Sequence, residues 1–227
     1  MTDTAGGAMW RRAAAAAMLA GWLAASPLPA AAEAAGPPVA PALAIPGVAS
    51  SAQAFVPDGF VLLREAQGDL GGGVPGVAQV YENADGRRAL LIGWRRPDGF
   101  EASGWGFVVP CRDCGIDLSG YDNYDVRIDG RAVVVEDRSA SAEQGTRTDA
   151  RLTLAYDAGL RRWRLATVSQ ATTFLRSGRA EHSFIDYLRG VSRDAVGKME
   201  DGAFRPESVQ EKPTPPQVLT LDGLALY

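Results

Sequence analysis

Short apolar runs separated by turn residues dominate the chain from residue 55 to residue 198. The runs are rich in Val, Ile, Leu and aromatic side chains, and Gly, Asp, Asn or Pro bounds each of them. This texture is typical of antiparallel strands. We therefore predict a mainly β protein, with an antiparallel sheet or meander of about eight to ten short strands in a single domain. The predicted strands are residues 60–64, 77–82, 88–95, 104–109, 124–128, 131–137, 150–156, 162–169 and 180–188.

Alternation within the runs supports this prediction. In the segment 150–156, Leu152 and Leu154 fall on one face of the expected strand, and Arg151 and Thr153 fall on the other. Segment 180–188 can be read as helix or strand, and its aromatic and β-branched side chains favour strand.

One turn signal is especially specific. Asp129 and Gly130 lie between the predicted strands 124–128 and 131–137. An Asp-Gly pair is the expected centre of a two-residue hairpin, because Gly accepts the positive φ that a type I′ turn requires.

The first 34 residues have the layout of a secretory signal peptide. Arg11 and Arg12 precede an apolar run over 13–25, and small residues around 30–34 offer cleavage sites. The apolar run is too short to span a membrane, which takes about 20 helical residues. We therefore predict a signal peptide over 1–34, a periplasmic or secreted protein, and no transmembrane segment in the mature chain.

Two further segments are expected to lie outside the β domain. Residues 35–54 are rich in Ala and Pro and carry no charge, so we predict a flexible lead-in. After Lys198 the chain becomes polar and then rich in Pro. The prediction is thus a β domain over 55–198 followed by an extended C-terminal tail over 199–227.

Charge and composition exclude several classes of function. The chain has 23 basic and 27 acidic residues, for a net charge of -4. This balance argues against general affinity for nucleic acid, which needs clustered Lys and Arg. The single His182 excludes a multi-histidine metal site and leaves one candidate base. The sequence contains no nucleophile elbow, phosphate-binding loop, zinc-protease or dinucleotide fingerprint.

The loop around Asp69 carries a resemblance. The stretch from Gln67 to Tyr81 is similar to the D-x-N-x-D-G loop that leads into a strand in FG-GAP-type calcium repeats. In such loops alternating oxygen ligands surround the cation. Here only Asp69 remains, with Gly71 and Gly76 where further ligands are expected. One carboxylate cannot hold calcium by itself, so we expect a glycine turn without a metal and no cofactor.

The resemblance extends over roughly residues 55–222. The similar pieces are Arg95-Arg-Pro-Asp-Gly99, Pro110-Cys-Arg-Asp-Cys-Gly115, the hairpin at Asp129-Gly130, Tyr156 to Leu165, and Asp186-Tyr-Leu-Arg-Gly190. They resemble uncharacterised secreted bacterial proteins with a single degenerate FG-GAP/VCBS-like β domain. That resemblance implies a fold and an exported location, but no established reaction and no catalytic residues.

Cys111 and Cys114 are the two cysteines of the chain and form a C-x-x-C motif. In an oxidising compartment we predict a local disulfide between them. A thioredoxin-like redox pair would need a helix after the first Cys, and the neighbouring Pro110 and Gly115 do not favour one. A structural zinc site would need four ligands.

An acidic loop follows the cysteines. Asp113, Asp117, Asp122 and Asp125 could offer oxygen atoms to a cation, but their spacing matches no known calcium loop, and solvated turns are the simpler interpretation. A group of arginines on strand edges is expected to blunt those edges, or alternatively to bind an anionic envelope polymer. These arginines are residues 87, 88, 95, 96, 161, 162 and 164.

Three functions are compatible with this sequence. The first is a non-enzymatic domain that binds an unknown protein or envelope component. The second is a hydrolase of an envelope polymer that uses paired carboxylates, with Asp113 to Asp125 and Glu136 as the dense acidic candidates. The third is a calcium-binding protein with an eroded loop. The first accounts best for the missing catalytic motifs, so the sequence predicts a binding protein rather than an enzyme.

Overall fold

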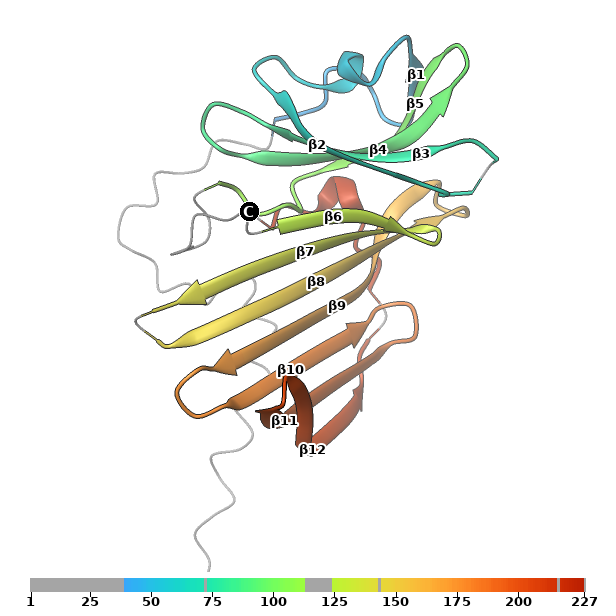
Figure 1. Cartoon of the computed structure of the whole chain (residues 1–227). Coiled ribbons are helices and arrows are strands. Elements are labelled where there is room, and N and C mark those ends of the chain that lie inside the picture. Colours follow the sequence, from blue (N-terminus) through green and yellow to red (C-terminus); the bar gives the residue numbers. More distant parts are fainter. Residues whose placement is uncertain (1–38, 72, 113–123, 143, 216, 227) are drawn as a thin grey trace, which may run out of the picture. The chain divides into compact units, whose positions relative to one another are not determined.

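The computed structural model describes residues 39–71, 73–112, 124–142, 144–215 and 217–226. Within these residues, twelve strands form two antiparallel sheets, and the only helices are two short 3-10 turns (Figure 1). The prediction of a mainly β, antiparallel protein is confirmed. The strands are longer than expected, and the longest has 13 residues. The two sheets belong to the same compact unit.

The first sheet has five strands in the order β1-β5-β4-β3-β2. One of its faces carries an aromatic cluster that includes Phe55, Phe60, Phe100 and Trp105. Phe55 is 1% exposed and lies between β1 and β2 in the chain. The strands are β1 (Gly47–Ala49), β2 (Val61–Gly68), β3 (Gly76–Glu82), β4 (Arg88–Arg96) and β5 (Gly99–Gly106).

The segment expected as a flexible lead-in contributes to this sheet. Residues 47–49 form β1 and pair with β5, and residues 52–55 form the 3-10 helix η1 (Ala52–Phe55). Ile45, Ala49 and Ala52 pack against the aromatic cluster. The apolar side chains of this Ala-rich and Pro-rich segment therefore cover one face of the sheet, which the sequence pattern did not reveal.

The second sheet has seven strands, each next to its neighbour in sequence, so it is a simple meander. The prediction of strand for residues 180–188 is confirmed for residues 180–186, which belong to β10, whereas 187 and 188 lie in the turn that follows. Residues 203–213, expected as part of an extended tail, form the edge strand β12 and pair with β11. The strands are β6 (Tyr124–Asp129), β7 (Ala132–Ser141), β8 (Thr146–Asp157), β9 (Arg162–Phe174), β10 (Arg179–Asp186), β11 (Val191–Glu200) and β12 (Ala203–Pro213).

The hairpin between β6 and β7 is present, but its turn lies one residue later than predicted. Asp129 pairs with Ala132, so Gly130 and Arg131 are the two central residues. Gly130 has a φ of +57°, whereas Arg131 is not among the residues with positive φ. A type I′ turn needs positive φ at both positions, so the predicted turn type is wrong.

One face of the seven-stranded sheet, called the inner face here, packs on the five-stranded sheet. It carries Val135, Leu152 and Leu154, each at most 1% exposed. Trp94 of β4 contacts Tyr156 of β8 edge to face, with ring centroids 5.9 Å apart. The alternation of Leu152 and Leu154 with Arg151 is confirmed, because the two leucines are buried on the inner face and Arg151 is exposed on the opposite, outer face.

The C-terminal segment completes this core. Leu221, in the 3-10 helix η2 (Leu221–Gly223), is 1% exposed. A Cβ atom added to Gly104 or Gly106 would come within 3.0 Å of Leu221 side-chain atoms. The amide of Leu165 also donates a 2.8 Å hydrogen bond to the Leu219 carbonyl. Two glycines of β5 therefore make room for a side chain that lies more than 100 residues away in the sequence.

Candidate functional site

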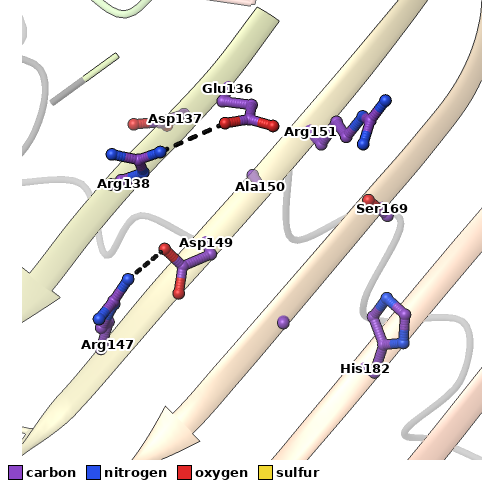
Figure 2. Close-up of a pocket in the computed structure, with 10 residues that line it drawn as sticks. Glu136, Asp137, Arg138, Arg147, Asp149, Ala150, Arg151, Ser169 and His182 are labelled. Atoms are coloured by element: carbon purple, nitrogen blue, oxygen red, sulfur yellow. Dashed lines mark hydrogen bonds and ion pairs between the residues drawn. The ribbon is translucent and has the colours of Figure 1, made fainter. Parts of the chain in front are cut away.

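A groove of about 310 Å³ opens over strands β7 to β10 (Figure 2). Strand pairing explains its composition, because directly opposed residues share one face of a sheet. Two rows of opposed residues cross the outer face of the seven-stranded sheet here, namely Glu136–Arg151–Ser169 and Arg138–Asp149–Ala171–His182. We call this site the charged groove; Arg147, Asp137 and Ala150 line it as well.

The charged groove follows β9. Ser169 and Ala171 of β9 have small side chains and form its floor. Figure 2 shows Asp149 and Arg151 on the strand to one side of this floor and His182 on the strand to the other side. The two walls thus differ in chemistry, one being charged and the other bearing an imidazole ring.

Glu136 is the most strongly paired carboxylate of the groove. Its two oxygens lie 2.8 Å from Arg127 Nη2 and 3.3 Å from Arg138 Nη2. The hydrogen bond from Arg127 lowers the pKa of Glu136, and this outweighs the opposing effect of burial. The charge of Arg127, Arg138 and Arg151 lowers the same pKa further. Glu136 is therefore held as an ionised hydrogen-bond acceptor.

The other charged side chains of the groove are paired in the same way. Arg147 Nη2 lies 2.9 Å from Asp149 Oδ1, and Arg151 Nη2 lies 3.5 Å from Asp129 Oδ2. Guanidinium groups donate and carboxylates accept. The wall on β7 and β8 therefore presents fixed donors and acceptors in alternation, with little net charge.

His182 closes the other side of the groove. Burial lowers the pKa of its imidazole, and the nearby charge of Arg193 lowers it further. Its ring also contacts Phe204 edge to face, with centroids 6.1 Å apart. At neutral pH the ring is uncharged, so it offers one donor, one acceptor and an aromatic surface.

In the glycine loop that resembles a calcium loop, the side chain of Asp69 bonds to the backbone of its own loop. Asp69 Oδ1 accepts a 2.7 Å hydrogen bond from the amide of Gly71. The Gly71 carbonyl in turn accepts a 3.0 Å hydrogen bond from Trp94 Nε1. Together with Arg131, the loop borders an open surface cavity of about 580 Å³. The Asp69 carboxylate thus holds the backbone of its own loop at Gly71, and the absence of a metal stays a prediction.

The acidic loop and the cysteine pair are only partly described. Asp113, Asp117, Asp122 and Cys114 lie outside the described residues, so the predicted disulfide stays a prediction. Asp125 lies on β6, where its carboxylate is 2.8 Å from Arg64 Nη1. Among the residues that the structure describes, no three His, Cys, Asp or Glu side chains are grouped as a metal site would require.

None of the seven arginines singled out in the sequence lines the charged groove. Arg88 differs most from the expectation of an edge residue, because it is 6% exposed and donates from Nε to Glu82 at 2.8 Å. Arg112 donates to the same carboxylate. Burial alone would raise the pKa of Glu82, but these two arginines lower it below its ordinary value. Arg88 and Glu82 thus form a buried ion pair, and the more exposed Arg112 adds a second charge to the same carboxylate.

The sequence did not point to the charged groove as a site. Glu136 was considered only together with the acidic loop, and His182 only as an isolated base. A signal was present, because Arg147, Asp149 and Arg151 alternate with other residues along one strand. That pattern is also typical of an ordinary solvated face, and only the pairing of four strands brings the residues together.

Comparisons with protein-family models, with curated proteins and with solved structures find no match for this chain. The resemblance to FG-GAP-type proteins and the exported location therefore stay predictions. In the part of the chain that the structure describes, there is no helix with the length and apolar character needed to cross a membrane.

Proposed function

We propose that this chain is an exported, envelope-associated binding protein, and that it binds its ligand in the charged groove without cleaving it. The observation that carries this proposal is the groove itself, a polar concave surface on paired strands. Export is supported by the signal-peptide layout of residues 1–34.

The ion pairs of the groove favour binding because they fix its side chains in advance. Arginine loses much rotamer freedom when it is immobilised by a ligand. In the groove Arg138 and Arg147 already contact carboxylates at 3.3 and 2.9 Å. Side chains positioned on strands are also held more rigidly than side chains on loops. A ligand would therefore contact charged side chains that need little further ordering when it binds.

A carboxylate-dependent hydrolase is the second candidate, because three acidic residues, Glu136, Asp137 and Asp149, line one groove. Glu136 and Asp149 occupy diagonal positions on β7 and β8, where Cα atoms are about 7 to 8 Å apart. Such hydrolases need one carboxyl group with a raised pKa that can donate a proton. The pKa of Glu136 is lowered instead. Glu136 is therefore unsuited to the role of proton donor in such a hydrolase.

Co-sedimentation with envelopes isolated from a Gram-negative bacterium tests the proposal. The informative variant is Asp149→Ala/Arg151→Ala, which removes charged groups from the groove wall. Its matched control is Lys198→Ala/Glu207→Ala, which removes an exposed ion pair with a 3.2 Å separation outside the groove. We expect the unmodified protein and the control to sediment with the envelopes, and the groove variant to lose about tenfold in affinity. Equal sedimentation of all three proteins would contradict the proposal.

The same samples distinguish binding from hydrolysis. Soluble envelope fragments are measured after prolonged incubation with the unmodified protein and with Asp149→Asn. We expect no fragments above background from either protein. Fragment release that requires Asp149 would establish the hydrolase instead.

A further inference from the structure

We infer that the ligand of the charged groove is a neutral glycan, a chain of uncharged pyranose rings that lies along β9. This inference rests on the proposed function, because it names the class of ligand for the same groove. Three properties of the groove support it: its balanced charge, its two unlike walls, and its floor of small and hydroxyl side chains.

The charge balance favours uncharged hydroxyl groups. An anionic polymer would approach Glu136 and Asp149, both of which line the groove. A cationic ligand would meet the guanidinium groups of Arg138 and Arg151 in the same place. A hydroxyl group both donates and accepts, so it can bond to a guanidinium and to a carboxylate at once. Hydrogen bonds to charged groups are also the stronger ones.

The second wall supplies a surface for the apolar face of a sugar. Phe184 lies two residues after His182 on the same face of β10 and directly opposite Ser169 of β9. Phe204 packs against the His182 ring. A pyranose ring has hydroxyl groups around its edge and C–H groups on its faces. It can therefore place its faces against the aromatic side chains, burying apolar surface, while its edge reaches the charged wall.

The floor of the groove indicates a chain of sugars rather than a single one. Thr167 and Thr173 continue the line of Ser169 and Ala171 on the outer face of β9. Every second residue along this strand thus presents a hydroxyl or a methyl group. No bulky side chain of β9 interrupts this line between residues 167 and 173.

Isothermal titration calorimetry with hexasaccharides tests the inference on the intact mature protein. The neutral probes are cellohexaose, maltohexaose and the hexamer of N-acetylglucosamine, and the anionic probe is hexagalacturonate. We expect at least one neutral hexamer to bind, with an affinity that changes less than about twofold between low and moderate salt, because uncharged ligands are not screened. We expect the anionic hexamer to bind no more tightly.

Two variants test whether the neutral hexamer binds in the charged groove. Ala171→Trp fills the floor without removing a polar group, and we expect it to abolish binding of the neutral hexamer. His182→Ala removes the ring from one wall, and we expect a loss of about tenfold. The matched control is Ser208→Trp on the exposed face of β12, which should bind like the unmodified protein. Circular dichroism melting of each variant identifies any that fail to fold.

The outcomes separate this inference from the proposed function. Tighter, salt-sensitive binding of hexagalacturonate would overturn the inference in favour of an anionic ligand. So would a failure of all three neutral hexamers to bind. In either case, envelope sedimentation that still depends on Asp149 and Arg151 leaves the proposed function standing. If sedimentation does not depend on Asp149 and Arg151 either, the inference and the proposed function are both wrong.

Discussion

The indole nitrogen of Trp163 donates a 2.8 Å hydrogen bond to the hydroxyl oxygen of Ser103. Trp163 belongs to β9 and Ser103 to β5, so this bond joins the two sheets inside the core. Ser103 in turn donates to the carbonyl oxygen of Ile92 at 3.1 Å. The two side chains are 1% and 7% exposed. Water therefore has little access to either group, and the indole N–H depends on the Ser103 oxygen for its acceptor.

Ser103→Ala is expected to destabilise the protein by about 1 to 3 kcal/mol, because it leaves the buried N–H of Trp163 without its acceptor. Chemical denaturation followed by tryptophan fluorescence measures this change in the free energy of unfolding. The matched control is Ser208→Ala, at an exposed position of β12. It should change stability by less than about 0.5 kcal/mol. Equal effects of the two substitutions would contradict the role of the inter-sheet bond.

Leu221→Ala is expected to cost about 2 to 5 kcal/mol, because it leaves a cavity between Gly104 and Gly106 that the backbone cannot easily fill. Val218→Ala in the same segment is the control, since Val218 is 57% exposed. It should cost less than about 0.5 kcal/mol. A small effect of Leu221→Ala in urea denaturation would show that the C-terminal segment is not part of the core.

The fold could be predicted where burial leaves an alternating pattern. Leu152 and Leu154 face the core while Arg151 faces solvent, so β8 was identified from its sequence. The same logic fails for β12, most of whose side chains are exposed. Its strand conformation comes from backbone pairing with β11, and such pairing does not depend on the kind of side chain present. The short strand β1 was missed for a related reason, because three residues are too few to show a period.

The candidate site was beyond prediction because it depends on register. Glu136, Asp149 and His182 lie on three different strands, and a shift of one residue in any pairing would send a side chain to the opposite face. The register on each side of β9 is set partly by turns and bulges, such as the irregularity between Thr153 and Leu154. Charged side chains also carry no periodic burial signal. Their grouping is thus a property of the assembled sheet.

Glu82→Gln is expected to lower the free energy of unfolding by about 3 kcal/mol, since it removes the carboxylate charge that accepts the hydrogen bond from the buried guanidinium of Arg88. Glu101→Gln is the control. Glu101 pairs with Arg96, but both side chains are about one third exposed, so the cost should be below about 1 kcal/mol. Comparable costs in thermal or urea denaturation would contradict the distinction between the two pairs.

The pH dependence of stability offers a second test of the same cluster. The folded-state pKa of Glu82 is below the ordinary value of 4.5. Its contribution to stability is therefore fully present above pH 4.5 and is lost as the pH falls through the folded-state pKa. We expect the unmodified protein to lose more stability on acidification than Glu82→Gln does. Parallel curves for the two proteins would show that this carboxylate is not linked to folding.

Cys111 and Cys114 are expected to be oxidised to a disulfide in protein exported to an oxidising compartment. Mass spectrometry after alkylation without reductant should find neither cysteine modified, and both should become alkylated after reduction. Because the loop between them is short, the stabilisation should be at the low end of the usual range, which begins near zero and reaches about 5 kcal/mol. Two alkylated thiols before reduction would contradict the predicted bond.

His182 should titrate below its ordinary value of 6.5, first because it is half-buried and second because Arg193 is nearby. It is the only histidine of the chain, so its NMR titration is unambiguous. Arg193→Gln should raise the midpoint yet leave it below 6.5, because burial is the larger cause. Arg179→Gln is the control, since Arg179 pairs with Glu181 on the inner face of the sheet.

The lowered pKa of His182 also determines the direction in which protein stability changes with pH. Since the folded-state pKa of His182 is lowered, the unfolded chain takes up the proton first as the pH falls. The contribution of the neutral ring is thus present above pH 6.5 and is lost as the pH falls through the folded-state pKa. If the groove binds hydroxyl groups through a neutral imidazole, affinity for a neutral hexasaccharide should weaken over the same range. An NMR titration midpoint of His182 at or above pH 6.5 would contradict the half-buried position of its imidazole ring.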